Sequence, residues 1–309
     1  MFSYSLNSLI VFHTVAKTRS FSKAANILFM TQPGVSNHVT QLEAQTGAML
    51  LKREKGKFQL TKEGKAVFKY AEKIESVARG LENTIKSMKK DAKPVLKIAI
   101  TPVYSRVMMP FILASFQQAN PDIAIKLDLG NSDDMLKTVI NMQNDVAVLA
   151  NQMNSQKVFA FPLLKEELVL ITCNNHPLAA KETVSLHEIS EYPLVIREEG
   201  SSTRKVVLSA LESINLTPTS LIEVKSTEFI KQWVSQGKGI SILIKRAVME
   251  DEHKYLKVIH LKENLSLKVS VLFLKSKKYD TSIQKFVDHM AQLKAESYLQ
   301  QLKNTTIPS

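Results

Sequence analysis

Apolar positions near the start of the chain recur at helical spacing and predict two short helices in succession. The first helix covers residues 4–17. Its single buried stripe consists of Leu6, Leu9, Ile10, His13 and Ala16. Ser22 is a suitable N-cap for the second helix, which covers residues 23–29. The small side chains of Ala24 and Ala25 let another helix approach this one closely.

A third helix follows after a short break and presents a polar face. Thr31 can cap it, Pro33 suits a first turn whose amides lack partners, and Gly47 ends it. Its inward residues are Val35, Val39 and Leu42. Its outward residues are Gln32, Ser36, Asn37, His38 and Gln41. Such short polar groups can hydrogen-bond to base edges or phosphates when a helix N-terminus enters a major groove, although a polar helix face is more commonly just solvated.

Two short strands follow the third helix and form a basic hairpin. Residues 50–53 and 58–61 have strand character, and the turn between them is Lys55-Gly56-Lys57. The combination predicts a winged helix-turn-helix. The cations of the wing, which can pair with phosphates or reach the minor groove, are Lys52, Arg53, Lys55 and Lys57. The hydroxyls of Ser22 and Thr31 can donate to backbone oxygens of a nucleic acid.

Residues 63–89 lack proline and carry an apolar seam that steps alternately by four and three positions. The seam consists of Val67, Ala71, Ile74, Ala78, Leu81, Ile85 and Met88. A helix of this length spans about 40 Å, and a heptad seam is buried most simply against a copy of itself. We therefore expect a twofold dimer that presents two reading helices to a pseudo-palindromic site. The alternative is a long helix packed on its own domain. A polar hinge follows at residues 86–94.

After Pro94 the pattern changes to short apolar strands that alternate with helical stretches. The expected strands are residues 95–100, 123–129, 146–150, 168–172, 194–196, 221–224, 240–244, 256–261 and 268–274. The expected helices are residues 108–118, 133–142, 203–214, 227–236 and 282–302. Such alternation argues for parallel sheets with helices on both faces. Two lobes fit better than one, with the chain crossing between them near residues 163–166 and 261–267.

Hydroxyl and amide side chains lie on loops that follow the expected strands, where an open α/β structure binds its ligands. The candidates are Thr101, Asn151, Ser202, Thr203 and Ser226. Together with helix N-termini rich in unpaired amides, these neutral donors suit a small anion. For any one of Ser202, Thr203 and Ser226, an ordinary N-cap is the more common interpretation.

The net charge of +12 is concentrated in the first third of the chain. Residues 1–93 hold 16 Lys and Arg against 7 Asp and Glu, a net +9, which leaves 25 against 22, or +3, for residues 94–309. A basic segment of this kind indicates a polyanion partner, nucleic acid first and a membrane surface second. We expect no membrane-spanning segment, since the longest apolar runs are far shorter than the ~20 residues required.

Little in the sequence indicates catalysis. Cys173 is the single cysteine, so the chain cannot form an internal disulfide or a thiolate metal cage, and this cysteine usage fits a reducing cytoplasm. Phosphate-loop and HExxH motifs are absent, and we expect neither a metal nor a cofactor. His176 is close to Cys173 in sequence, but a cysteine at the end of an apolar strand is more often simply buried. We expect no catalytic residues.

The first sixty-odd residues resemble the N-terminal signature of LysR-type transcriptional regulators. The match comprises residues 20–25 (SFSKAA), Leu28, residues 31–36 (TQPGVS), Leu42, Glu43, Gly47, Leu50, Arg53 and residues 60–64 (LTKEG). It departs at Gly34, where the family usually has Ala and where glycine loosens the helix by up to ~1 kcal/mol, and at Leu51, usually Phe. The resemblance implies that one set of side chains faces the bases, namely Gln32, Pro33, Ser36 and Asn37. It implies that another faces the DNA backbone or minor groove, namely Ser22, Thr31, Arg53 and Lys57.

The same resemblance implies a type II periplasmic-binding-protein-like effector domain in the rest of the chain. Residues 234–240 and 176–178 match recurring elements of that domain. The positions that correspond best to effector-contacting loops are Thr101, Asn151, Ser202, Thr203 and Ser226. Family members are commonly tetramers that bind upstream of a promoter.

We therefore expect an α/β protein with three parts: a winged helix-turn-helix DNA-binding domain at residues 1–62, a dimerisation helix and hinge at 63–93, and a two-lobed effector domain at 94–309. The lobes are expected at residues 94–164 with 267–309, and at 165–266. The predicted function is a cytoplasmic transcriptional regulator whose binding to double-stranded DNA is modulated by a small anionic metabolite. The alternatives are an effector-independent architectural DNA-binding protein and an enzyme on a binding-protein scaffold.

Overall fold

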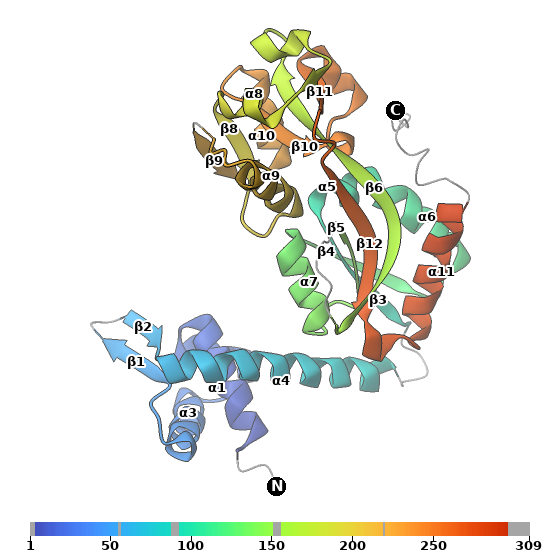
Figure 1. The fold of residues 1–309 in the computed structure, drawn as a ribbon. Coiled ribbons are helices and arrows are strands. Elements are labelled where there is room, and N and C mark those ends of the chain that lie inside the picture. The colour runs from blue at the N-terminus through green and yellow to red at the C-terminus, as the bar shows by residue number, and fades with distance from the viewer. Residues whose placement is uncertain (1–3, 55–56, 88–92, 151–155, 219, 296–309) are drawn as a thin grey trace. The chain divides into compact units, whose positions relative to one another are not determined.

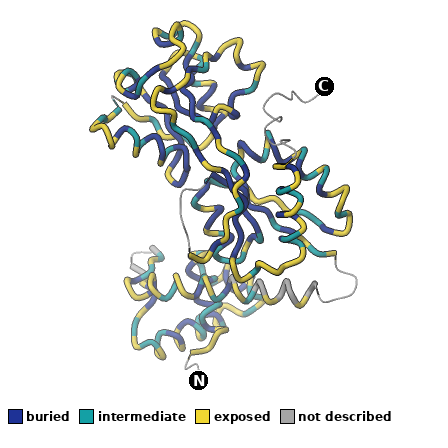
Figure 2. The backbone as a smooth tube through the Cα atoms, turned by 45° about the vertical axis from the view of Figure 1, so that its right-hand side comes forward, coloured by how far each residue is buried: buried dark blue, intermediate teal, exposed yellow. Residues whose placement is uncertain are grey.

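The chain divides near Ala92 into two compact units, each with its own hydrophobic core (Figures 1 and 2). The computed structural model describes residues 4–54, 57–87, 93–150, 156–218 and 220–295. Within these ranges, no helix combines the length and the hydropathy that a bilayer crossing requires.

The first unit is a helical domain with a short hairpin. Its elements are α1 Leu6–Thr18, α2 Phe21–Leu28, α3 Gln32–Thr46, β1 Leu51–Glu54, β2 Lys57–Leu60 and α4 Lys62–Ser87. The first three helices begin where a hydroxyl side chain accepts a hydrogen bond from a backbone N–H three residues further on, at Ser5, Ser20 and Thr31. Gly47 ends α3 as predicted, in the left-handed conformation with a φ of 67°.

Two predictions for this unit are wrong in detail. Ser20, not Ser22, caps α2, so Ser22 lies inside the first turn with its side chain exposed. In α1, Leu6 is 52% exposed, and the core face adds Val11, Phe12 and Val15 to the predicted His13 and Ala16. Since residues 9–13 are almost all apolar, spacing alone does not define the helix phase, and packing of α1 on α3 and α4 selects it.

Glu43 ties the third helix to the hairpin. Its Oε1 accepts hydrogen bonds from the backbone N–H of Leu50, at 2.7 Å, and of Leu51, at 3.1 Å. β1 and β2 pair antiparallel with Leu51 opposite Leu60. The predicted inward residues of α3 are all buried, namely Val35, Val39 and Leu42. The helix-turn-helix and its wing therefore form one packed body.

The 26-residue helix α4 is buried near its start and exposed further along. Ala71 is fully buried in the core of the first unit and Val67 packs against that core, so the start of the predicted seam is covered by its own domain. Further along, Leu81 is 61% and Ile85 is 52% exposed. Ile74 and Ala78 are half-buried, and Met88 lies outside the described residues. The apolar seam that a second copy could cover is therefore the C-terminal part of the helix.

The second unit consists of two lobes (Figure 1). Lobe I holds β3 Val95–Ile100, α5 Pro102–Val107, α6 Met109–Ala119, β4 Ala124–Leu129, α7 Ser132–Ile140, β5 Val146–Ala150, β12 Ser266–Leu274 and α11 Thr281–Ala295. Lobe II holds β7 Thr183–Val184, α8 Leu186–Ser190, β8 Leu194–Arg197, α9 Ser202–Ser213, β9 Leu221–Val224, α10 Thr227–Ser235, β10 Ser241–Ile244 and β11 Leu256–Leu261. Short 3-10 helices add η1 Pro177–Ala180, η2 Lys245–Ala247, η3 Glu250–Lys254 and η4 Lys275–Lys277.

The long strand β6, Val158–Cys173, belongs to both lobes. Its residues 158–167 pair with β12, and residues 168–173 pair with β10 and β11. The sequence pattern predicts a strand at 168–172 only, because the charged residues Lys165, Glu166 and Glu167 interrupt the apolar run and conceal the continuous backbone ladder.

The sheets are mixed rather than parallel, which corrects a second prediction. β3 pairs parallel with β4 and β5, and β8 with β9, as the alternating pattern requires. β12 pairs antiparallel with both β5 and β6, because the two strands that cross between the lobes run in opposite directions. The segment after the first strand, expected as the loop that carries Thr101, is largely taken up by α5. The described part of the final helix, α11, runs to Ala295, and its predicted end at residue 302 lies outside the described residues.

Gly64 sits where α4 starts against the hairpin and leaves no room for a side chain. A Cβ at this position would lie 2.0 Å from the Leu50 carbonyl oxygen. The Gly64 N–H donates to Thr61 Oγ1 at 2.8 Å, and that hydroxyl donates to the Met49 carbonyl at 2.8 Å. The close approach of helix and hairpin therefore depends on glycine here.

We expect Gly64→Ala to lower the free energy of unfolding of the first unit by about 3 kcal/mol, because backbone has to move to admit the methyl group. Urea unfolding of the full chain followed by far-UV circular dichroism checks this, while fluorescence of Trp233, the single tryptophan, reports on the second unit. Gly34→Ala is the matched control: its Cβ would lie 3.2 Å from Thr31 Oγ1, so the change should stay within about 1 kcal/mol. Equal effects of both variants would contradict the steric argument.

Candidate functional site

The helix α3 of the first unit presents a polar, exposed face. Gln32, Pro33, Asn37 and Gln41 are exposed, and Ser36 is half-buried. This face begins at the N-terminus of the helix, where backbone N–H groups and the helix dipole favour negative charge. The arrangement allows the first turns of α3 to meet the base edges and phosphates of a duplex.

The structure brings some predicted contact residues of this unit together and leaves others apart. Ser22 Oγ donates to Gln32 Oε1 at 3.4 Å, so these two residues lie side by side at the start of α3. The Thr31 hydroxyl accepts a hydrogen bond from the Gly34 N–H and so acts as the N-cap of α3. His38, expected on the outward face, is half-buried and its Nδ1 lies 3.0 Å from the Ser8 hydroxyl.

The wing carries the remaining predicted contacts. Lys52 is exposed on β1. In the hairpin register, Arg53 lies opposite Phe58 and Lys57 lies opposite Glu54. The side chains of Arg53 and Lys57, and the whole of Lys55, lie outside the described parts of the structure.

In the second unit, the two lobes enclose a cavity of about 30 Å³, with space for about two water molecules. Its polar lining consists of Thr101, Tyr104, Asn131, Ser132, Arg197, Ser201, Ser202, Thr203 and Thr227. Its apolar lining consists of Val103, Ala150, Leu243, Ile244, Ala247 and Leu267. Both lobes contribute to each set, so this cavity is the candidate ligand site, and we call it the inter-lobe cavity.

Of the predicted ligand contacts, Thr101, Ser202 and Thr203 line the inter-lobe cavity. Thr101 stands at the N-cap position of α5 but makes no capping hydrogen bond through its side chain. Ser202 Oγ donates to the Ala150 carbonyl at 2.6 Å and thereby joins the lobes. Ser226 is an ordinary N-cap that accepts from the Phe229 N–H, and the cavity is lined instead by its neighbour Thr227. Asn151 lies outside the described residues.

Sequence reasoning missed Arg197, the charged residue of the cavity lining. Its Nε and Nη2 donate to the two carboxylate oxygens of Glu198 at 2.8 and 3.0 Å, and its Nη1 donates to Thr227 Oγ1 at 3.1 Å. Both side chains of this pair are 8% exposed. The sequence did offer a signal for this residue, since Arg197 is a cation at the end of an apolar strand and is followed directly by glutamates. The guanidinium charge is therefore present at the cavity but already neutralised by Glu198.

Tyr104 was missed for a different reason. It lies on α5, in a segment expected to be a loop, and the first turn of that helix turns its ring inward to 2% exposure.

The lobes touch closely at the rim of the cavity. Lys205 Nζ of α9 lies 2.5 Å from Asp133 Oδ1 of α7, and the Asp133 N–H donates to the Gly200 carbonyl at 3.0 Å. Gly200 has a φ of 88°, and a Cβ there would lie 2.6 Å from Asn131 Oδ1. On the other side, Arg106 Nη1 of α5 lies 2.5 Å from Glu228 Oε1 of α10.

Cys173 and His176 are not arranged as a nucleophile and its base. Cys173 is half-buried at the end of β6, and His176 Nδ1 accepts from the Leu178 N–H at 3.2 Å, which occupies that nitrogen in starting η1. Burial lowers the pKa of His176 from its usual value. Among the residues described, no three His, Cys, Asp or Glu side chains are grouped so that they could hold a metal ion.

Family models match most of the chain. Residues 6–65 match the model described as "Bacterial regulatory helix-turn-helix protein, lysR family", and residues 89–295 match the model described as "LysR substrate binding domain". The transcriptional activator CmpR of Synechocystis sp. is 32% identical over 289 residues, which cover 93% of this chain and 94% of CmpR.

Two solved structures share the fold. Full-length CbnR complexed with its target DNA has a TM-score of 0.65 at 18% identity, covering 93% of this chain and 99% of CbnR. The effector binding domain of QuiR in complex with shikimate has a TM-score of 0.60 at 21% identity, covering 66% of this chain and 99% of the QuiR domain.

We expect Glu198→Gln to lower the free energy of unfolding of the second unit by about 3 kcal/mol, because it leaves the buried Arg197 charge without its counterion. Urea unfolding followed by Trp233 fluorescence measures the change. Glu223→Gln is the control, since Glu223 is 48% exposed in its ion pair with Arg204 and should contribute less than about 1 kcal/mol. A loss in Glu198→Gln no larger than in Glu223→Gln would contradict this assignment.

Proposed function

This chain belongs to the LysR family of bacterial helix-turn-helix regulators, and we propose that α3 and the wing read double-stranded DNA while the inter-lobe cavity binds a small anionic effector. It is a DNA-binding transcriptional regulator whose action is modulated by a ligand. We propose the division into a DNA-binding domain at residues 1–62, a dimerisation helix and hinge at 63–93 and an effector domain at 94–309. We propose the cytoplasm as its location, because the protein acts on promoter DNA.

The observation that carries the proposal is the two-sided character of α3. Its apolar side is buried in the core of the first unit, and its polar side is exposed from the N-terminus onward. We assign the base edges to Gln32, Pro33, Ser36 and Asn37, and the phosphates or minor groove to Ser22, Thr31, Arg53 and Lys57. The complex of CbnR with its target DNA, which has the same fold, supports this use of the first unit.

A dimer places two such helices on one duplex. The exposed Leu81 and Ile85 of α4 support a contact between two copies of this helix at its C-terminal part. A C2 dimer matches a pseudo-palindromic promoter site, and further contacts between dimers would give a tetramer.

The inter-lobe cavity supports the second half of the proposal. Thr101, Ser202, Thr203 and Thr227 line it. The last three are the first residues of α9 and α10, so the N-termini of both helices lie at the cavity. The effector binding domain of QuiR, solved with shikimate, supports a small-molecule site in this fold. We retain Asn151 as a proposed contact and withdraw Ser226, whose hydroxyl is used as a cap.

Ligand binding can alter DNA binding only through a difference in affinity between two states of the protein. Groups of both lobes line the cavity, so a ligand held by both favours the closed state. Closure changes the surface that each effector domain offers to its neighbours, and hence the arrangement of the dimers and the spacing or bend imposed on DNA.

Two substitutions separate the proposed DNA contacts. Ser36→Ala should relax base preference, whereas Arg53→Ala should weaken binding to all sequences and reduce the slope of log affinity against log salt by about one unit. Fluorescence anisotropy with a duplex selected in vitro by the wild-type protein, with single-base variants of that duplex, and over a salt series measures both effects. Equal, sequence-independent losses in the two variants would show that the assignment is wrong.

A ligand screen tests the effector site. A metabolite present at 100 times its dissociation constant should stabilise the closed protein by about 2.7 kcal/mol, raise its melting temperature and alter the DNA footprint. Thr203→Val should abolish the response. Ser226→Ala should keep it while losing about 1 kcal/mol of stability through the missing cap. If a broad metabolite library moves neither the melting temperature nor the footprint, the effector-independent architectural alternative replaces this half of the proposal.

A further inference from the structure

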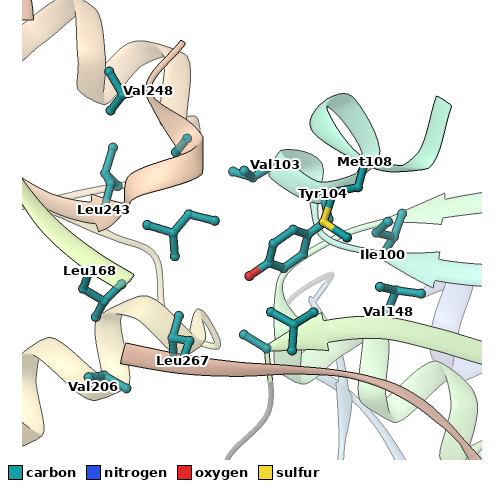
Figure 3. Packing of buried hydrophobic residues seen from close by; sticks show 14 of the residues in the cluster. Ile100, Val103, Tyr104, Met108, Val148, Leu168, Val206, Leu243, Val248 and Leu267 are labelled. Carbon is teal, nitrogen blue, oxygen red and sulfur yellow. The ribbon is translucent and has the colours of Figure 1, made fainter. Parts of the chain in front are cut away.

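Tyr104 of α5 places a buried hydroxyl at the inter-lobe cavity. The residue is 2% exposed and lines the cavity. Its buried Oη forms no hydrogen bond with any residue that the structure describes. Figure 3 shows the ring extending from α5 and the hydroxyl pointing away from Met108 and Ile100, toward Leu267 and the Leu243 side of lobe II. The hydroxyl is therefore directed from lobe I toward lobe II.

Arg246 of η2 supplies a second such donor from lobe II. Its Nε donates to Glu166 Oε1 at 2.7 Å, in an ion pair whose side chains are 5% and 4% exposed. Its Nη1 is buried as well and finds no hydrogen-bond partner in the described parts of the chain. Glu166 lies opposite Leu267 in the ladder of β6 and β12. Leu267 and Ala247, the residue that follows Arg246, both line the inter-lobe cavity.

Tyr104, Glu166 and Arg246 are close enough to interact electrostatically. Burial raises the pKa of Tyr104 well above its usual value; the Glu166 carboxylate raises it further, and the Arg246 guanidinium opposes the shift. At neutral pH the phenol is therefore protonated and can donate. A guanidinium can only donate. Two buried donors that have no acceptor among the described residues therefore lie near each other at the crossing between the lobes, and such donors are both rare and costly.

On the basis of the effector cavity proposed above, we propose that Tyr104 Oη and Arg246 Nη1 form the inner end of the effector site, where they donate to an oxygen of a compact oxyanion. Each lobe provides one of the two donors. A ligand oxygen bonded to both is held only while the lobes are together, which makes the pair a direct link between occupancy and closure.

The surroundings favour a small ligand bound by hydrogen bonds. The cavity volume of about 30 Å³ in this structure leaves space for few non-hydrogen atoms. The guanidinium groups near the cavity already have carboxylate counterions, which are Glu198 for Arg197, Glu166 for Arg246 and Glu228 for Arg106. The charge of the ligand is therefore met by oriented donors, with Tyr104 and Arg246 at the inner end and Thr101 and Thr203 elsewhere on the lining. Carboxylate, phosphate and sulfate share this chemistry.

Calorimetric titration of the full-length protein with three probes, inorganic phosphate, inorganic sulfate and malonate, tests the proposal and separates inorganic oxyanions from carboxylates. We expect at least one probe to bind the wild type. Tyr104→Phe removes the hydroxyl only and should weaken that binding at least about tenfold. Arg246→Lys can keep the ion pair with Glu166 but loses Nη1, and should weaken it to a similar extent. Tyr279→Phe, at a position 89% exposed in the same unit, should change nothing.

Stability without any probe distinguishes a binding role from a structural one. Because the hydroxyl has no hydrogen-bond partner in the described part of the chain, Tyr104→Phe should melt at the wild-type temperature or above it. The variant should bind DNA like the wild type, but its footprint should no longer respond to the probe. Earlier melting of Tyr104→Phe would mean that the hydroxyl supports the fold, and the inference would be wrong.

The remaining outcomes are equally decisive. Failure of all three probes to bind the wild type, or wild-type affinity in Tyr104→Phe, would overturn the proposed inner end. Arg246→Lys with unchanged affinity would remove Arg246 from it. Thr203→Val separates this inference from the effector cavity itself. Binding lost in Thr203→Val but retained in Tyr104→Phe overturns the inner end alone, whereas binding retained in both overturns the cavity as the effector site.

Discussion

The antiparallel pairing of β6 with β12 is the constraint on which the second unit depends. The first part of β6 pairs with β12 in lobe I, and its last residues pair with β10 and β11 in lobe II. Because one continuous strand carries both sets of backbone hydrogen bonds, the lobes can change their angle about it but cannot separate. Leu267 shows how close the cavity lies to this crossing, since it is opposite Glu166 in the ladder and lines the cavity.

The interactions that join the lobes are of two strengths. At the rim, Lys205 with Asp133 and Arg106 with Glu228 form ion pairs whose side chains are 32% to 54% exposed, and such pairs contribute little in salt solution. At the crossing, Arg246 and Glu166 are buried, where removal of one partner is costly. Weak contacts at the rim can be broken at little cost while the buried pair at the crossing holds, so a ligand that contacts both lobes needs only a modest differential affinity to change how the lobes are arranged.

Features set by neighbouring residues in the chain were predicted more accurately than features set by contacts between distant residues. Thr31 and Gly47 bound α3 correctly because capping depends on neighbours in the chain, and β3, β5, β9 and β11 have the predicted bounds because their apolar runs are short and clearly ended. The predicted N-cap at Ser22 is wrong because Ser20 offers the same chemistry two residues earlier. Arg197 and Tyr104 could not be assigned to a site from sequence, since only the folding of β8 and α5 brings them to one cavity.

Position 200 tolerates few residues other than glycine. Its positive φ strains any other residue, and a Cβ there would lie 2.6 Å from Asn131 Oδ1, so the Asn131 amide would have to move. Any replacement therefore disturbs the same contact between the lobes, whatever its polarity or charge. Variants at position 200 should share this one defect, and a second change that shortens Asn131 should relieve the steric part of it.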